Sequence, residues 1–515
     1  MKKYLLLLSI FSYTIISAQN PDDALRTAWF TQNGTARTMA IGGALGSLGG
    51  DITSANINPA GLGLYKTSEF ILSPGFALNN NKFNYRGTDT TNNKNKFNYG
   101  PIGFVFGHSN SRKSEFSSSA FAISVNQLAN YNNRIQFKGF NNQSSFTEQY
   151  LEELVRDRAD TFAALDNYIF GSSLAFRTFL IDTLRGNSGE VLGYKTLVDS
   201  ALRHGGINQD YISSSRGGYH EIALGLAGSL QDKVYLGGSL TIPVSYYERT
   251  LTYSETDATA NPNNNFESFT FQEKTKSFGI GLGLKLGAIF KPTDAWRLGF
   301  AFHTPQLMTF TDNIRSSLVA NTEGYAHTRS ESSDNLNDGN AGERKYNIVT
   351  PYRAIASASF VIEDKTGDTK KQRGFLSADI EFVNYRGARY SQVNEEDDDE
   401  AMRSYLKMTN AAIKDYYKGN FNFRLGGELK FNTIMVRLGG AYYGSPYSDE
   451  QLKASRTVAS GGLGYRNKGM FIDLTYSHTF VKDVVFPYRL NDKANTYAEQ
   501  TGSRGNVVMT LGFKF

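Results

Sequence analysis

Segments in which apolar and polar residues alternate follow one another from about residue 69 to the end of the chain. Between Asn422 and Phe431, for example, Phe423, Leu425 and Leu429 share one face, and polar residues such as Glu428 occupy the other. A period of two belongs to a β-strand, and about ten residues are enough for a tilted strand to cross a membrane. The pattern predicts an all-β fold whose strands each have one apolar face.

The order of short and long connections indicates where these strands lie. We expect about 14 strands, at 69–84, 96–108, 115–140, 215–230, 233–252, 268–290, 295–314, 343–363, 373–390, 419–431, 434–444, 455–466, 469–482 and 504–515. Short links such as Gln231-Asp232 and Asn432-Thr433 alternate with long ones near 85–95, 141–214, 253–267, 315–342, 391–418, 445–454 and 483–503. An outer-membrane barrel has short periplasmic turns and long external loops. A soluble β-sandwich has no reason to sort its loops in this way.

The first residues have the features of a secretory signal peptide. Lys2 and Lys3 precede an apolar run from Leu5 to Ile16, and the small residues Ser17 and Ala18 follow. The run is shorter than the roughly 20 residues that a spanning helix needs, so we expect cleavage after Ala18 rather than a membrane anchor. No later stretch is long and apolar enough for a spanning helix. An exported chain of this kind enters a membrane through its strands.

Composition and motifs exclude several classes of function. The net charge is +5, without a basic cluster of the kind that binds nucleic acid. The chain has no cysteine, which removes thiol catalysis, disulfides and iron–sulfur centres. Its six histidines form no H-E-x-x-H pair, and there is no G-x-S-x-G motif. We therefore expect no metal, no cofactor and no enzymatic activity, although a catalytic triad assembled from distant strands would leave no such motif.

Residues 19–68 do not alternate, and they lead to a family resemblance. The small residues Ala40 to Gly46 permit tight backbone packing, and Asn58-Pro59-Ala60-Gly61 favours a turn. The segment ARTMAIGGALGSLGGDITSANINPAGL at 36–62 resembles the N-terminal hatch of the FadL-type family of long-chain fatty acid transporters. The resemblance continues in WRLGFAFHTP (296–305), TPYRAIASASFVI (350–362), FRLGGELKF (423–431), AYYGSPY (441–447) and GGLGYRNKGMFIDLTYSH (461–478).

The resemblance implies a transmembrane antiparallel β-barrel of about 14 strands at 69–515, with an N-terminal hatch at 19–68 inside it. It also implies passive uptake of hydrophobic small molecules, gated by the hatch, with Asn58, Pro59, Ala60 and Gly61 as its signature. Substrates would leave sideways into the membrane at a kinked third strand, which by position lies near Asn126–Asn133. That stretch has no proline or glycine, in contrast to what a kink favours.

Two sets of residues are candidates for the lumen. In the strand at 268–290, Gly279, Gly281, Gly283 and Gly287 share the face opposite to its apolar residues, so we expect them to face inward. They would leave room for a ligand or for the hatch backbone, or simply allow the strand to curve. Of the inward charges, Arg297, Arg353, Arg424 and Arg437 are candidates for holding a fatty acid carboxylate, because guanidinium matches that group.

The external loops and the chain end predict further partners. We expect a helix within 145–180, with Leu151, Leu154, Val155 and Phe162 on one side, and a second helix at 401–417. The first would cap the barrel mouth, contact a partner protein or pack only on its own loop. The protein would lie among outer-membrane lipids and lipopolysaccharide. The terminal Phe515 resembles the signal read by the outer-membrane assembly machinery. A second hypothesis for function is therefore a structural subunit of a larger outer-membrane assembly.

Overall fold

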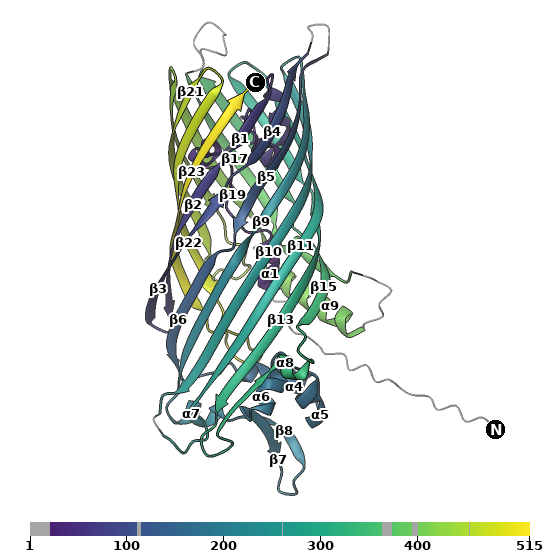
Figure 1. The fold of residues 1–515 in the computed structure, drawn as a ribbon, viewed down its shortest axis with the longest axis vertical. Helices are drawn as coiled ribbons and strands as arrows, with labels where there is room; N and C mark the ends of the chain where they lie inside the picture. Colours follow the sequence, from purple (N-terminus) through teal and green to yellow (C-terminus); the bar gives the residue numbers. More distant parts are fainter. Residues whose placement is uncertain (1–20, 111–114, 260, 363–372, 394–399, 453) are drawn as a thin grey trace, which may run out of the picture.

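The computed structural model describes residues 21–110, 115–259, 261–362, 373–393, 400–452 and 454–515. The expected signal peptide at 1–18 lies outside the described residues. Most of the chain forms one tall barrel, with a group of short helices at one end and the carboxyl terminus at the other (Figure 1). None of the helices in these ranges is long and apolar enough to cross a membrane.

The wall is a closed antiparallel β-barrel of 14 strands, several of which are divided in two. In order they are β1 (Glu69–Leu72) with β2 (Pro74–Tyr85), β3 (Thr88–Tyr99) with β4 (Ile102–Ser109), β5 (Phe116–Asn130) with β6 (Asn133–Asn141), β9 (Ile207–Leu230), β10 (Val234–Asp257), β11 (Ser268–Phe290), β12 (Trp296–His303) with β13 (Leu307–Asn321), β15 (Gly342–Val349) with β16 (Arg353–Ile362), β17 (Gly374–Asn384) with β18 (Arg389–Ser391), β19 (Gly419–Phe431), β20 (Ile434–Tyr443), β21 (Ser455–Asn467), β22 (Met470–Val485) and β23 (Ala498–Lys514). The barrel closes where β23 pairs with β1 and β2. The predicted fold class is confirmed.

Strand lengths and turns follow from local sequence, with one correction. Gln231 and Asp232 both have positive φ, at 51° and 53°, and make the tight turn between β9 and β10. The long connection expected at 85–95 is wrong: β2 and β3 are joined by Arg86-Gly87 alone. Both residues have positive φ, and a two-residue turn of this kind matches the twist of paired strands. The polar run after Tyr85 belongs to a strand that rises above the membrane.

An apolar belt surrounds the half of the barrel that carries the short turns. On β11 the outward side chains from Phe278 to Leu286 are between 40% and 53% exposed, and every second residue is apolar. Outward residues of the same strand before Phe278 are polar, including Lys274 and Lys276. Since exposed apolar side chains are stable only against lipid, β11 leaves the membrane near Phe278 and continues beyond it.

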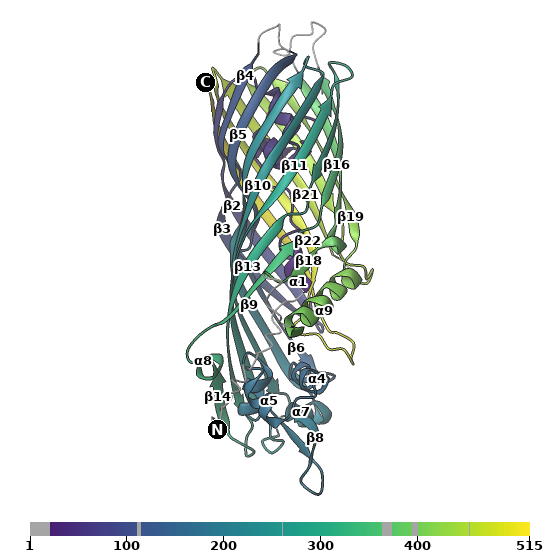
Figure 2. The same ribbon diagram turned by 90° about the vertical axis from the view of Figure 1, so that its right-hand side faces the viewer.

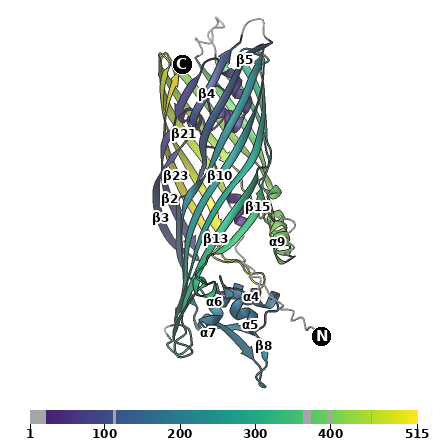
Figure 3. The same ribbon diagram turned by 45° about the vertical axis from the view of Figure 1, so that its right-hand side comes forward.

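The long loops build a head at the other end. It contains α4 (Glu148–Arg156), α5 (Thr161–Asp166), α6 (Ser172–Arg177), α7 (Val198–His204), α8 (Ser333–Leu336), and the strands β7 (Ile181–Arg185), β8 (Val191–Thr196) and β14 (Thr328–Ser332) (Figures 1 and 3). The single helix expected within 145–180 is replaced by three short ones. Of its expected apolar side, Leu154 is buried, whereas Val155 and Phe162 are exposed.

The head closes the outer mouth of the barrel through an aromatic cluster centred on Phe146. The ring of Phe146 lies 4.5 Å from that of Tyr253 on β10, 5.4 Å from Phe271 on β11 and 6.0 Å from Tyr488. A further helix, α9 (Glu400–Tyr416), lies outside the wall near η3 (Tyr385–Gly387), and Figure 2 shows it beside the barrel. It corresponds to the helix expected at 401–417. Described hydrophobic residues thus seal the head end of the lumen.

Candidate functional site

The N-terminal segment, residues 21–68, lies inside the barrel, and its residues from Asp23 to Tyr65 are mostly buried. It consists of α1 (Pro21–Arg26), α2 (Ala36–Ala40), α3 (Ser54–Ile57) and the 3-10 turn η1 (Pro59–Leu64), joined by close turns. The purple elements within the barrel in Figure 1 show this arrangement. Its backbone runs so close to the wall that many wall positions facing it are glycines.

Glycines on the wall act as sockets for this segment. A side chain on Gly287 of β11 would strike the Asn58 amide, and one on Gly237 of β10 would strike the backbone of Pro59. On β19 and β20, Gly426 and Gly439 face the backbone of Ile41 in the same way. Glycine is required at each position, because any β-carbon would push the segment off the wall.

Only one glycine of the predicted stripe belongs to these sockets. Gly287 lies against the side chains of Asn58 and Pro59 in this segment, whereas the sequence analysis expected contact with its backbone. The other three make room for side chains of the wall itself. These contacts are Gly279 with the ring of Phe310, Gly281 with Met308, and Gly283 with Gln306. At those positions the glycines allow inward side chains of β13 and its preceding turn to cross β11.

Charged wall residues bind both backbone and side-chain groups of the segment. The Asp379 carboxylate accepts hydrogen bonds from the amides of Leu45, at 3.1 Å, and Gly46, at 3.0 Å. The buried Glu221 accepts one from the Asn56 side chain at 2.7 Å. Hydrogen bonds to a buried carboxylate are worth about 1.5–3 kcal/mol each, so these contacts strongly favour the seated segment.

The four predicted arginines are all placed inside the barrel and already have partners. Arg297 donates to the Leu48 carbonyl at 2.7 Å, and Arg353 donates to the Ala28 carbonyl and pairs with Glu381 at 3.5 Å. These two arginines therefore bind the N-terminal segment.

The other two are buried within ion pairs of the wall. Arg424 lies between Glu381 and Asp379, at 3.9 Å from the latter. Arg437 pairs with Glu428 and Asp473, both at 2.6 Å. A carboxylate ligand would have to displace these partners, which makes the pairs part of the support of the lumen.

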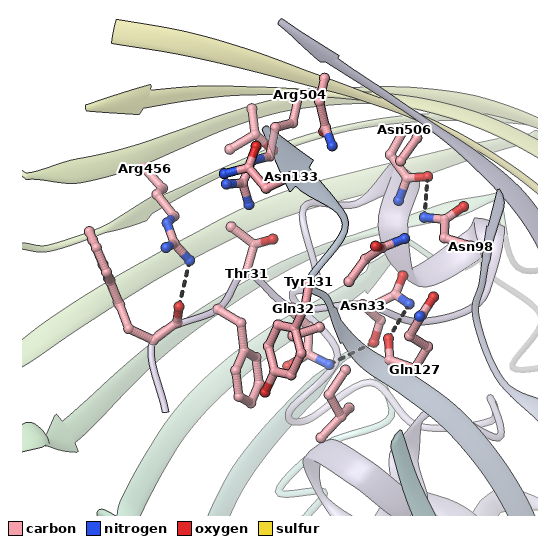
Figure 4. A pocket seen from close by; sticks show the side chains of 18 of the residues that line it. Thr31, Gln32, Asn33, Asn98, Gln127, Tyr131, Asn133, Arg456, Arg504 and Asn506 are labelled. Atoms are coloured by element: carbon pink, nitrogen blue, oxygen red, sulfur yellow. Dashed lines mark hydrogen bonds between the residues drawn. The ribbon is translucent and has the colours of Figure 1, made fainter. Parts of the chain in front are cut away.

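A cavity of about 320 Å³ lies between the start of the N-terminal segment and the wall. Trp29, Phe30, Met39 and Leu128 provide its apolar lining. Amide side chains provide most of the rest, and Figure 4 shows several of them pointing into this space. They are Gln32, Asn33, Asn79, Asn98, Gln127, Asn130, Asn133 and Asn506. A lumen site of this composition accommodates an apolar body together with a group that accepts hydrogen bonds.

Two arginines that the sequence analysis did not select reach into this cavity from the wall (Figure 4). Arg456 of β21 donates to the Trp29 carbonyl at 2.6 Å and lies 3.9 Å above the Trp29 ring. Arg504 of β23 makes no hydrogen bond or salt bridge with any described residue, and its Nε is buried without a partner. Both guanidinium groups interact with the charge of Asp483 and with each other. The site therefore carries excess positive charge.

The backbone ladder of the wall is interrupted beside the cavity. β4 pairs with β5, but β3 pairs only with β2 in the described structure, and no ladder joins it to β6. Side chains bridge this break: Thr90 and Asn92 donate to the Gln136 carbonyl at 2.7 and 3.0 Å. Lys94 donates to the Asn133 carbonyl at 3.2 Å. The wall is held here by side chains instead of backbone pairs.

The break has a local cause that needs no proline. β5 has a register shift between Gln127 and Ala129, and β6 starts only at Asn133. The Asn130 side chain accepts the amide of Asn132 at 2.9 Å, which makes a tight asparagine turn. On the neighbouring strand β9, Gly217 has a φ of 120°. The sequence signal for this break is therefore the pair Asn130 and Asn132, which lies near Gly217-Gly218 of β9. It falls in the stretch where the kink was expected.

Comparison with known proteins agrees with the observed fold. Residues 219–515 match the family model described as "Outer membrane protein transport protein (OMPP1/FadL/TodX)". The chain belongs to the FadL/TodX family. Like the rest of this family it is a bacterial outer-membrane β-barrel of the hydrophobic-compound channel type and not an enzyme.

Solved members of the FadL/TodX family share the architecture at low sequence identity. A FadL homologue from Pseudomonas aeruginosa superposes with a TM-score of 0.56 at 14% identity, over 95% of this chain and 99% of that one. The P. putida toluene transporter TodX superposes with a TM-score of 0.51 at 12% identity, over 94% and 99%. A search of curated proteins found no match. At these identities the superpositions establish a common fold.

Proposed function

We propose that this barrel carries hydrophobic molecules passively across the outer membrane, with the N-terminal segment as a hatch and the break between β3 and β6 as a lateral exit. The main support is that Leu128, Ala129 and Asn130, which end β5 at the break, and Tyr131, which follows them, also line the cavity of about 320 Å³. A molecule in this cavity lies next to the one part of the wall where side-chain contacts alone join neighbouring described strands.

The hatch role rests on how the segment is held. Asn58, Pro59 and Ala60 touch β10 and β11, and Asn58 donates to the Gly46 carbonyl at 2.6 Å. Gly61 packs against Gly49, which folds the segment on itself. Arg297 and Arg353 bind it from the wall, and Arg424 and Arg437 belong to the ion pairs of the wall around it. A ligand that competes for Trp29 or Phe30 in the cavity would loosen the start of the segment, while these contacts hold the rest.

Arg456 and Arg504 suit cargo with an acidic head. The two guanidinium groups share the charge of Asp483, and a carboxylate ligand would compensate the remaining buried positive charge through paired hydrogen bonds. The apolar side chains Met39 and Leu128 would then contact the hydrocarbon part. TodX is a toluene transporter, so neutral cargo is also known for this fold. We assign amphipathic acids to this chain because of the two arginines.

Uptake by vesicles tests the proposal. Liposomes containing the mature protein should take up labelled dodecanoate and toluene faster than empty ones. Arg504→Gln should lower dodecanoate uptake about tenfold, because a charged hydrogen bond is lost, and leave toluene uptake unchanged. Arg466→Gln, an arginine outside the cavity lining, serves as the matched control. Uptake equal to that of empty liposomes would contradict the channel, and equal dodecanoate uptake by Arg504→Gln would contradict the head-group role.

A structural role in a larger assembly is the second candidate, and one observation favours it. The head exposes apolar side chains at Phe162, Val155 and Leu192, which are 78%, 64% and 63% accessible. Exposed apolar groups on a soluble surface are typical of docking sites. Purification from native membranes should then bring down a stoichiometric partner, and Phe162→Ser with Leu192→Ser should release it. Recovery of the barrel alone from both proteins would rule out this role.

A further inference from the structure

Basic side chains gather on the outside of the barrel, immediately beyond the apolar belt. On β11, Lys276 and Lys274 follow the last outward apolar residue, Phe278. The registers of β9, β10 and β11 place Arg216 and Lys276 on either side of Glu248. On β6, the exposed Arg134 lies opposite Ser214, two residues from Arg216 along β9. Neighbouring strands thus carry cations at one height.

The group extends to the break in the wall. Arg134 lies at this break, because β6 starts at Asn133. We call the four residues Arg134, Arg216, Lys274 and Lys276 the basic patch. It surrounds a single described acid, Glu248, which pairs with Arg216 at 2.5 Å and Lys274 at 3.5 Å. The next acid on β9 is Asp210, and Lys138 lies opposite it and balances its charge. The patch therefore keeps a large positive excess.

The basic patch lies at the level of the lipid head groups of the outer leaflet. Phe97, Tyr246 and Phe278, which lie next to the patch on β3, β10 and β11, are 63%, 40% and 50% exposed. Aromatic side chains form girdles at the interfaces of membrane barrels. The long loops lie on the same side, which makes it the extracellular one. Cations in this position face the charged layer of the membrane.

We propose that the basic patch binds the phosphate groups of lipid A, the anchor of lipopolysaccharide, beside the break between β3 and β6. Arginine and lysine side chains bind phosphate through charge-assisted hydrogen bonds, and several on one rigid sheet can engage one phosphorylated sugar together. The bound lipid would stand at the edge of the opening. This inference rests on the outer-membrane location and not on the transport proposal.

Native mass spectrometry of the delipidated mature protein tests the patch. Diphosphoryl lipid A and its dephosphorylated form are added separately. The protein should bind the phosphorylated form about tenfold more tightly, since a cation near a charged lipid surface contributes roughly fivefold. The variant Arg134→Gln, Arg216→Gln, Lys274→Gln, Lys276→Gln should lose this preference. Removing Lys233, Lys291, Lys430 and Lys468 at the opposite end should preserve it.

Two outcomes would overturn the proposal. One is equal binding of the two lipids by the unaltered protein, and the other is an unchanged preference in the four-residue variant. Binding to diphosphoryl lipid A that does not weaken with rising salt would count against it as well, because exposed charges are screened. Toluene uptake in vesicles without lipid A should be the same for both proteins, which separates this result from the fate of the channel proposal.

Discussion

Asn58 and Gly287 meet where the N-terminal segment touches the wall, and the Asn58 side chain fills the space that any side chain at 287 would need. The same amide group of Asn58 reaches the Gly46 carbonyl at 2.6 Å. One residue thus fastens the segment both to itself and to β11. The need for glycine at 287 is explained by Asn58, a residue more than 200 places earlier in the chain.

Gly287→Val should therefore displace the segment without preventing barrel assembly. Overpacking of this kind costs about 1–3 kcal/mol. Proteolysis of the mature protein should then cut between residues 40 and 60 much faster than in the unaltered protein. Gly193→Val, where nothing lies within 4 Å of the added carbon, is the control and should change nothing. Equal protection of the segment in both variants would contradict the socket.

Asp379→Ala removes the acceptor for the amides of Leu45 and Gly46 and leaves Arg424 without one of its acids. Loss of one partner from a buried charge network costs about 3–5 kcal/mol. We expect faster amide hydrogen exchange at residues 44–47 in the variant, with unchanged exchange in the head. Slow exchange at Leu45 and Gly46 in Asp379→Ala would show that the carboxylate does not hold them.

Removing the side-chain hydrogen bonds across the break between β3 and β6 should speed transport. Thr90→Val with Asn92→Leu removes both donors to the Gln136 carbonyl, about 1 kcal/mol each. If molecules leave through the break, the variant should release toluene into the membrane several-fold faster in a vesicle assay. Thr88→Val with Asn93→Leu on the same strand serves as the control. Rates that match in the two variants would argue for an exit elsewhere.

The stability of the head should depend on pH through Glu255. Glu255 lies nine residues beyond Tyr246, the last exposed apolar residue of β10, and so about 30 Å farther along the strand, outside the apolar belt. It accepts hydrogen bonds from Phe146, Gln209 and Tyr253, yet burial raises the pKa of its carboxyl to about 7. The folded head therefore holds this proton more tightly than the unfolded chain does.

The stabilisation is complete below the unfolded pKa of about 4.5 and disappears as the pH rises through about 7. Between pH 5 and 8 the free energy of unfolding of the head should fall by about 2 kcal/mol. Hydrogen exchange at residues 145–155, corrected for the intrinsic rate, measures this change. Glu255→Gln should remove this dependence, and Glu267→Gln, on the exposed rim, should retain it. A pH-independent head in the unaltered protein would refute the assignment.

Local patterns predicted the wall far better than the lumen. Alternation placed Phe423 and Leu425 on the lipid face, and turn residues such as Asn432 with Thr433 marked where strands reverse, because both depend on neighbours in the chain. The turn at Arg86-Gly87 was missed because polar strand residues above a membrane look like a loop. Val155 and Phe162 were misplaced since helix breaks in the head depend on packing.

The cavity could not be read from the sequence at all. Arg456 and Arg504 lie on separate strands, and nothing near either residue in the chain distinguishes it from Arg424 or Arg437, which have acids opposite. The difference lies in the cross-strand partners: Arg437 finds Asp473 within 2.6 Å, whereas Arg504 has no acid at contact distance among the described residues. Such partners become visible only once the register is known.

The length of β9 and β10 has a consequence for the cell surface. Each has 24 residues, roughly 80 Å of extended chain, whereas the hydrocarbon layer needs only about ten of them. The remaining residues hold the head well beyond the bilayer. In the transport that we propose, a hydrophobic molecule bound near the head has already crossed the hydrophilic sugar layer of the cell surface before it reaches the bilayer.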